Sequence, residues 1–341
     1  MPPTLASTSP HSGSTDSELD TILTSFDTSY VWNYASAKEG LRDLYEKAKR
    51  EQWNGTEQLP WETPVDPESE IIPQSFNPLA DWAPFRKLDP KEVPRFQHAQ
   101  LSWSLSQFMH GEQGALMTAS QLVGAVPWID AKYYAASQTM DEARHVEVFS
   151  RYLREKLEWE WPINENLKKL LDMILTDSRW DFKYLGMQIL VEGLAMAAFA
   201  NLYQMAREPL IKELIRYVMR DESRHVAFGV LSLRDFYTDM PESERRDREE
   251  FTIEACELMR DRLIGEDVLR YFGFDAKAGR EVILASPVMQ LFRQLLFMRV
   301  VPNIRRLGLL TPRVRSAFES LGILKFENFD TEAVDRQLGI A

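Results

Sequence analysis

Most of the side chains that could do chemistry belong to one short motif that occurs twice. The pattern Asp-Glu-x-Arg-His stands at residues 141–145 and again at 221–225, and these copies contain two of only five histidines in the 341-residue sequence. Each copy follows an isolated glutamate, Glu112 or Glu192, which lies 30 residues before the motif's own glutamate (142 − 112 and 222 − 192). The sequence therefore contains the same two-helix unit twice.

The spacing within each copy suits metal binding. Residues three apart share one face of an α-helix, so the glutamate and histidine of each Glu-x-x-His lie side by side. Glu112 and Glu192 lie in apolar segments, where metal coordination would remove the desolvation penalty of a free carboxylate. A glutamate from each of two helices and Glu-x-x-His from two others can bind a metal pair. The predicted ligands are Glu112, Glu142, His145, Glu192, Glu222 and His225.

The remaining motif residues predict support behind these ligands. Asp141 and Asp221 lie four residues before the histidines on the same helical face and are placed to accept the second imidazole N–H. Arg144 and Arg224 would neutralise these aspartates. For a single copy, a surface ion-pair ladder would be the simpler interpretation, but two matched copies favour a buried centre. Carboxylate and imidazole ligands favour iron or manganese, so we expect two iron ions, with manganese or a mixed Mn/Fe pair as alternatives.

The chain that positions these residues is expected to be all-helical. Apolar residues recur at three- and four-residue spacing after residue 91, and strand signals are scarce. We predict a disordered tail at 1–24, an arm at 25–90 packed on the core, a four-helix core at 91–240 and further helices of the same domain at 241–341. The expected core helices lie near 91–123, 128–156, 179–206 and 210–238, with later helices near 242–264, 287–306 and 312–320.

Composition excludes several classes of protein. A net charge of −12 argues against nucleic-acid binding. The single cysteine, Cys256, allows neither an intrachain disulfide nor a cysteine metal cluster, which favours the cytoplasm. Residues 1–18 lack the basic and apolar regions of a secretory signal. We expect no membrane span, because charges interrupt apolar stretches before the roughly 20 residues that a span needs.

The order of an isolated glutamate followed by an Asp-Glu-x-Arg-His motif, found twice, resembles that of the ferritin-like di-iron carboxylate oxygenase superfamily. The Asp-Glu-x-Arg-His motif is most similar to that of the hydroxylase subunits of bacterial multicomponent monooxygenases. The resemblance covers residues 91–237 and extends weakly to 44–53. It implies a ferritin-like four-helix bundle with additional flanking helices. It also implies a non-haem di-iron oxygenase or oxidase that uses O₂ as co-substrate to hydroxylate, desaturate or otherwise oxidise a small hydrophobic, acyl or aromatic compound. A reductase or ferredoxin would supply electrons, and a homodimer is expected by analogy.

Three positions depart from relatives within that superfamily. Phe149 stands where small subunits of ribonucleotide reductase carry a radical tyrosine, so a tyrosyl radical is not expected there. Val218 replaces the third histidine of arylamine N-oxygenases, and Met196 replaces a threonine of the multicomponent hydroxylases. An arylamine-type N-oxygenase and an iron-storage ferroxidase remain alternative functions, and a structural bundle without metal is a third.

Small and apolar residues near the ligands could line a substrate pocket, although ordinary core packing is an equal alternative. They are Ala115, Leu116, Ala195, Met196, Phe199 and Phe228.

Overall fold

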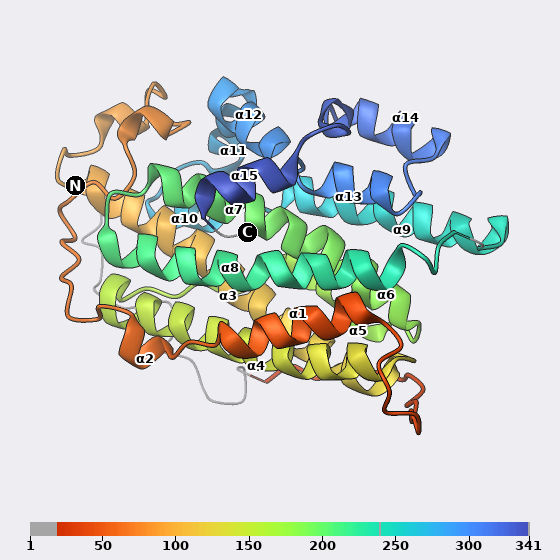
Figure 1. Ribbon diagram of the computed structural model, residues 1–341. Helices are drawn as coiled ribbons and strands as arrows, with labels where there is room; N and C mark the ends of the chain where they lie inside the picture. The colour runs from red at the N-terminus through yellow and green to blue at the C-terminus, as the bar shows by residue number, and fades with distance from the viewer. Residues whose placement is uncertain (1–18, 239, 340–341) are drawn as a thin grey trace.

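A computed structural model describes residues 19–238 and 240–339, and this part of the chain contains helices and no strand. The all-α prediction is confirmed. Residues 1–18, which make up most of the predicted tail, lie outside the described residues. Four long helical stretches form the central bundle (Figure 1). They are α3 (Glu92–Ala125), α4 (Ile129–Tyr152), α6 (Trp180–Tyr184) running into α7 (Glu192–Met205), and α8 (Pro209–Leu233).

The start of α8 shows how local sequence sets a helix boundary. Pro209 occupies the first turn, where its missing N–H costs nothing. The Glu208 side chain accepts hydrogen bonds from the backbone N–H groups of Leu210 and Ile211, both at 2.6 Å. It also accepts one from the Tyr152 hydroxyl at 2.9 Å. The carboxylate thus caps α8 and links its first turn to the end of α4.

The third bundle stretch is not a regular α-helix. Leu185–Val191 is π-helical and connects α6 to α7 immediately before Glu192, and a second π-helical turn, Leu153–Leu157, extends α4. A π-helical turn inserts an extra residue and changes which side chains face inward. The direction of the Glu192 side chain therefore depends on this turn, which the periodicity of the sequence does not reveal.

The same stretch, Trp180–Met205, is long and apolar enough to cross a membrane, with a mean hydropathy of 1.5. This finding corrects the prediction that charges interrupt every such stretch. However, 89% of its apolar window is buried inside the protein. A helix that is apolar on all sides is expected at the centre of a large bundle, so its position supports the prediction of no membrane span.

The N-terminal arm is anchored on the bundle by a buried aspartate. Helix α1 (Glu39–Arg50) packs against α4 and α8 (Figure 1). Asp130 Oδ2 accepts hydrogen bonds from the backbone N–H groups of Ala37 and Lys38 at 2.9 and 3.0 Å, and Arg42 Nε donates to Oδ1 at 2.7 Å. A carboxylate at a helix N-terminus is favoured by the helix dipole. A short helix, α2 (Gly55–Gln58), follows.

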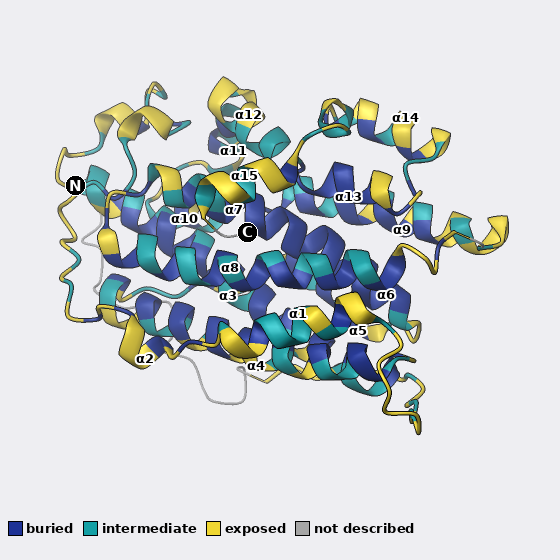
Figure 2. Cartoon of the chain, in the orientation of Figure 1, coloured by how far each residue is buried: buried dark blue, intermediate teal, exposed yellow. Residues whose placement is uncertain are grey.

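The remaining helices flank the bundle and share its core, because one cluster of buried apolar side chains runs from Leu41 to Ile323 (Figure 2). The predicted helix at 287–306 is two helices, separated by turn residues whose hydrogen bonds span three positions. The flanking helices are α5 (Glu165–Thr176), α9 (Glu242–Asp261), α10 (Glu266–Tyr271), α11 (Ala276–Ala285), α12 (Pro287–Leu295), α13 (Val300–Arg306), α14 (Pro312–Ser320) and α15 (Thr331–Leu338). Short 3₁₀ turns occupy Gln74–Phe76, Phe85–Lys87 and Leu324–Phe326.

Candidate metal centre

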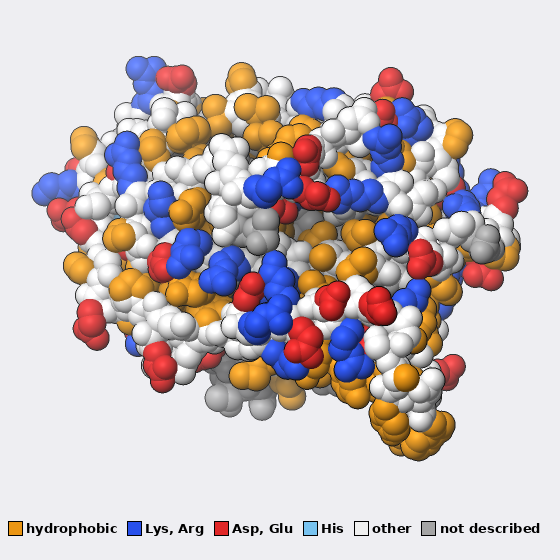
Figure 3. Space-filling model, viewed as in Figure 1, with side chains coloured by type: hydrophobic (Ala, Val, Ile, Leu, Met, Phe, Trp, Pro, Cys, Tyr) orange, Lys and Arg blue, Asp and Glu red, His pale blue; other side chains and the backbone are white. Residues whose placement is uncertain are grey.

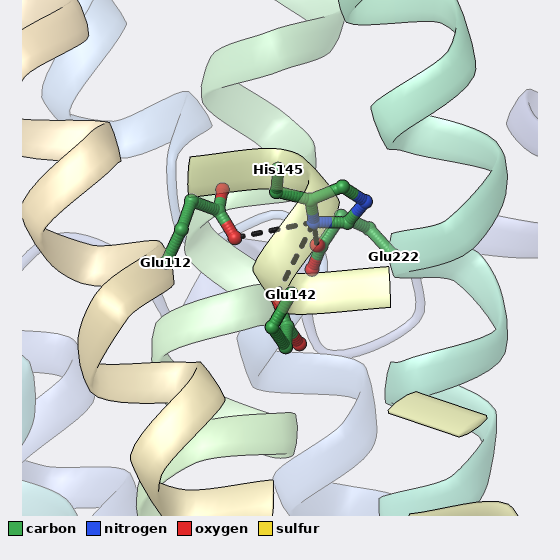
Figure 4. A group of neighbouring side chains, drawn as sticks. All are labelled: Glu112, Glu142, His145 and Glu222. Carbon is green, nitrogen blue, oxygen red and sulfur yellow. Dashed lines mark hydrogen bonds and ion pairs between the residues drawn. The ribbon is translucent and has the colours of Figure 1, made fainter. Parts of the chain in front are cut away.

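The six predicted ligands come from four different helical stretches and meet inside the bundle. Glu112 lies on α3, Glu192 begins α7, and the two Glu-x-x-His pairs lie on α4 and α8. All six are at most 6% exposed. Figure 4 shows four of them converging from three helices. The alternative of a surface ion-pair ladder is thereby excluded for both copies.

One group of ligand atoms surrounds His145. Its Nδ1 atom lies 3.3 Å from Glu112 Oε2, 3.2 Å from Glu142 Oε2 and 3.1 Å from Glu222 Oε1. One ligand atom from each of these four residues lies within 4.8 Å of the other three (Figure 4). A single metal ion could therefore contact all four.

A second group surrounds His225. Its Nδ1 atom lies 3.1 Å from Glu142 Oε1 and 3.5 Å from Glu222 Oε1. Glu142, Glu192 and His225 each offer one ligand atom within 4.8 Å of the others. Because Glu142 belongs to both groups, and because Glu222 Oε1 approaches both imidazoles, these two glutamates would be available to both ions of a pair.

Several ligand atoms lack the partners that buried polar atoms normally have. Within the described part of the chain, Glu142 Oε2, Glu192 Oε2, both Glu222 carboxylate oxygens and His225 Nδ1 are buried and make no well-directed hydrogen bond, although some of them lie close to one another and to His145 Nδ1. Native proteins leave few such atoms unpaired. Their hard oxygen and imidazole nitrogen chemistry matches what iron and manganese bind. The residues present therefore fit a pair of metal ions.

Burial and mutual repulsion set the acidity of the carboxylates. The pKa values of Glu112 and Glu192 are raised well above the usual range, first by burial and then by the charge of Glu222. Burial would also raise the pKa of Glu142, but the charge and hydrogen bonds of the histidines, beginning with His225, lower it. So many carboxylates in one buried place require positive charge.

The imidazoles supply part of that charge when no metal is bound. Burial alone would lower the pKa of both histidines. Hydrogen bonds from His145 to carboxylates, Asp221 first, raise its pKa, and the charge of Glu142 does most to raise that of His225. Protons therefore stabilise the cluster until a metal cation replaces them, and metal binding should release protons.

The two aspartates pair with histidines across the bundle. His145 Nε2 lies 3.1 Å from Asp221 Oδ2 on α8, and His225 Nε2 lies 3.3 Å from Asp141 Oδ2 on α4. The sequence placed each aspartate beside the histidine four residues later on its own helix, and this pairing is wrong, because each aspartate accepts from the histidine of the other helix. Each hydrogen bond leaves the Nδ1 atom facing the carboxylates.

Both motif arginines are buried beneath the aspartates. Arg144 Nη2 donates to Asp221 Oδ2 at 2.9 Å and also to Asp141. Arg224 Nη2 donates to Asp221, and Arg224 Nη1 donates to Glu51 Oε2 at 2.7 Å. The charged network predicted from the motif is therefore present in the structure.

Sequence reasoning missed the contribution of the arm to this network. Trp53 Nε1 donates to Asp221 Oδ2 at 2.7 Å, and Gln52 Nε2 donates to Asp141 Oδ1 at 2.9 Å. The Arg144 guanidinium also lies over the Trp53 ring, 4.7 Å from its centroid. The weak resemblance at residues 44–53 was the only signal that pointed to this segment.

A buried glutamine was also missed. Gln138 Nε2 donates to Glu142 Oε1 at 2.9 Å and to Glu192 Oε1 at 2.8 Å, so it ties two ligands together. Gln188 Nε2 donates in turn to Gln138 Oε1 at 3.3 Å. Gln138 lies four residues before Glu142, and that spacing on one helical face could have identified it.

A small cavity of about 20 Å³ adjoins the cluster and is lined by Glu112, Glu192 and Glu222 together with Gln107, Arg262 and small or apolar residues. Of the six residues proposed for a substrate pocket, Ala115 and Ala195 line it. The other four line neither this cavity nor the larger one beside α12. These four are Leu116, Met196, Phe199 and Phe228.

Comparisons with known proteins agree with this architecture. No protein-family model matches the sequence, and no curated protein matches it. The chain is similar to dimanganese(II)-NrdF from Streptococcus sanguinis, with 16% identity, a TM-score of 0.54, and coverage of 86% of this chain and 99% of that one. It is also similar to an R2-like ligand-binding oxidase with an aerobically reconstituted Mn/Fe cofactor, with 18% identity, a TM-score of 0.50, and coverage of 79% and 93%. This similarity confirms the predicted ferritin-like fold.

Proposed function

We propose that this chain, which has the ferritin-like fold, is a di-metal oxidase or oxygenase that uses O₂ to oxidise a small organic substrate. One observation carries the proposal: two groups of buried ligand atoms, each fitting one ion, share Glu142. Of the two similar structures, NrdF is a dimanganese protein and the R2-like oxidase has an Mn/Fe cofactor. These cofactors support two manganese ions or a mixed Mn/Fe pair here and are consistent with the two iron ions expected from the sequence.

Each residue has a definite role in this proposal. Glu112 and His145 would hold one ion and Glu192 and His225 the other, with Glu142 and Glu222 shared between them. The metal pair, when bound, supplies the redox chemistry that activates dioxygen. The protein would fix the orientation of the ligands. Asp221 and Asp141 fix the imidazole tautomers through their hydrogen bonds to the Nε2 atoms. Gln138 donates to two of the ligand carboxylates and so fixes their relative position.

The surroundings favour oxidation of a bound substrate over storage of a radical on the protein. Phe149, at the position of the radical tyrosine in ribonucleotide reductase small subunits, is fully buried and has no hydroxyl to oxidise. Its ring stacks against Phe199, with centroids 5.8 Å apart. The neighbouring small cavity of about 20 Å³ leaves space beside the ligands for a molecule of the size of water or dioxygen.

Three finer statements belong to the same proposal. Hydroxylation or desaturation fits better than arylamine N-oxygenation, because Val218 is buried and cannot provide a seventh ligand. A reductase or ferredoxin would return two electrons in each cycle. We also propose a homodimer in the cytoplasm.

Metal analysis of the purified protein tests the proposal. We expect about two iron or manganese ions per chain, because two ligand groups are present. His145→Ala and Glu222→Ala should each lose metal, whereas Glu213→Ala, a change on the outer part of α8, should keep it. Full metal content in both ligand variants would refute the assignment.

Oxygen consumption, screened with candidate acids, alkanes and aromatics, would then identify compounds that accelerate turnover.

A further inference from the structure

Arg262 is a buried cation beside the metal centre that neither the motif nor the proposed function uses. It follows the last residue of α9, is 4% exposed, and lines the small cavity together with Glu112, Glu192 and Glu222. Its Nε and Nη1 atoms have no hydrogen-bonding partner among the described residues. A buried guanidinium with free N–H donors is costly unless a ligand pairs with it.

The nearby carboxylates do not remove that cost. Burial lowers the pKa of Arg262 to about 10, and the charge of Glu112 opposes that shift only in part, so the side chain remains a cation at neutral pH. If Glu112 binds metal as proposed, its negative charge is shared with the ion. Arg262 then needs another anion.

Space for the apolar body of such an anion lies next to Arg262. A cavity of about 440 Å³ is lined by residues of α3, α7 and α10 to α12 and by residues 72, 73 and 75–78. Leu263 and Ile264, which directly follow Arg262, line it, and Phe108 lines both cavities. The larger cavity reaches the surface near Val288 and Leu291, which are 39% and 54% exposed. Hydrophobic side chains also gather over α11 and α12 at the top of Figure 3.

We propose that Arg262 binds the carboxylate of an organic acid substrate whose apolar part occupies the larger cavity. This inference rests on the proposed function, because it deepens the description of the same site. A guanidinium donates strong, charge-assisted hydrogen bonds to a carboxylate. A carboxylate suits the small cavity better than a bulkier phosphate, because the volume beside Arg262 is only about 20 Å³. Phe108 would separate the polar end of the substrate from its apolar end.

The test uses octanoate and its neutral analogue octanamide as probes, with calorimetric titration of the metal-loaded protein. Wild type should bind octanoate roughly tenfold to a hundredfold more tightly than octanamide, which is the range for losing hydrogen bonds to a charged group. Arg262→Met should abolish that preference while changing octanamide binding little. Arg262→Lys, which keeps the charge, should retain part of it. Thermal midpoints of the variants verify that each is folded.

Three results would overturn the role of Arg262. The first is a preference for octanoate that Arg262→Met retains and that metal-free wild type lacks. That result would mean that the metals alone bind the carboxylate. The second is equal binding of octanoate and octanamide by wild type. The third is inorganic phosphate binding as tightly as octanoate, which would indicate a site for small anions. Metal content is measured on the same samples, so a chain without metal would contradict the proposed function separately.

Discussion

His145 Nε2 lies 3.1 Å from Oδ2 of Asp221, an aspartate on the opposite helix of the bundle. The same oxygen accepts hydrogen bonds from Trp53 Nε1 and Arg144 Nη2. One carboxylate oxygen thus joins α8, α4 and the N-terminal arm. Through His145, its position is linked to the ligand atoms on the other side of the imidazole ring.

Replacing this aspartate should weaken metal binding without abolishing it. Asp221→Asn keeps the volume but removes the charge that fixes the His145 tautomer, so metal affinity should fall about 10- to 100-fold. Competition with a chelator measures the affinity. Asp235→Asn provides the control, because Asp235 pairs with Lys38 on the surface and its side chain is 62% exposed. Equal affinity in Asp221→Asn and wild type would contradict the proposed role.

The arm should contribute to stability through Trp53. This residue is 7% exposed, and Trp53→Phe removes the donor to Asp221 while keeping an aromatic ring near Tyr217. Leaving a buried acceptor with one partner fewer should lower the free energy of unfolding by about 1–3 kcal/mol. Urea denaturation measures the change. Trp32→Phe, at a 75% exposed position, should change it by less than about 0.5 kcal/mol.

Lys183 should make stability depend on pH in the alkaline range. Burial lowers the pKa of Lys183 to about 8 from 10.5, with Asp177 opposing the shift. Between those two values the unfolded chain holds the proton more tightly than the folded protein, so stability rises as pH increases. From pH 7 to 9.5, the wild type should gain about 1–2 kcal/mol relative to Lys183→Met.

Denaturant titrations of both proteins across that pH range measure this difference, and the Met variant cancels the contribution of all other titrating groups. A difference that stays constant with pH would show that Lys183 titrates alike in the folded and unfolded chains. The three acceptors near its Nζ atom, namely Gln121 Oε1 and the carbonyl oxygens of Ile174 and Leu175, explain how the amine is held inside.

Two glycines on α3 should respond oppositely to alanine. A Cβ at Gly114 would lie 2.5 Å from Leu171 Cδ2, whereas a Cβ at Gly111 would meet no atom within 4 Å beyond the adjoining backbone of its own helix. Gly114→Ala should therefore destabilise the protein by about 1–3 kcal/mol through overpacking. Gly111→Ala should stabilise it by about 0.5–1 kcal/mol through helix propensity. Thermal unfolding compares the two.

Gly111 also lines the small cavity beside Glu112. The methyl group that Gly111→Ala adds would therefore occupy space proposed for a reactant. We expect slower turnover with normal metal content in Gly111→Ala. Unchanged turnover would argue that reactants do not use this cavity.

The convergence of the six candidate ligands and the helical fold could be predicted from the sequence because both depend on local spacing. A glutamate and a histidine three residues apart share a helix face wherever the helix lies. The 30-residue separation that precedes both copies then predicted two equivalent helix pairs. Helices α3, α4 and α8 consequently begin within a few residues of their predicted positions.

Shorter helices were harder to predict. Helices α5, α10, α11 and α15 were not expected, and the expected helix at 287–306 is broken. Short segments show few repeats of the apolar spacing, and their helicity depends on packing against the bundle.

The sequence by itself determined which residues share each helix face, and thereby the six candidate ligands and the all-helical bundle. Only the tertiary structure decided which aspartate meets which histidine, that Gln138 joins two ligands, and that Arg262 at the end of α9 reaches the same cavity. The physical reason is distance along the chain. Local periodicity sets the direction of a side chain from its own helix, whereas contacts between helices depend on how their surfaces pack.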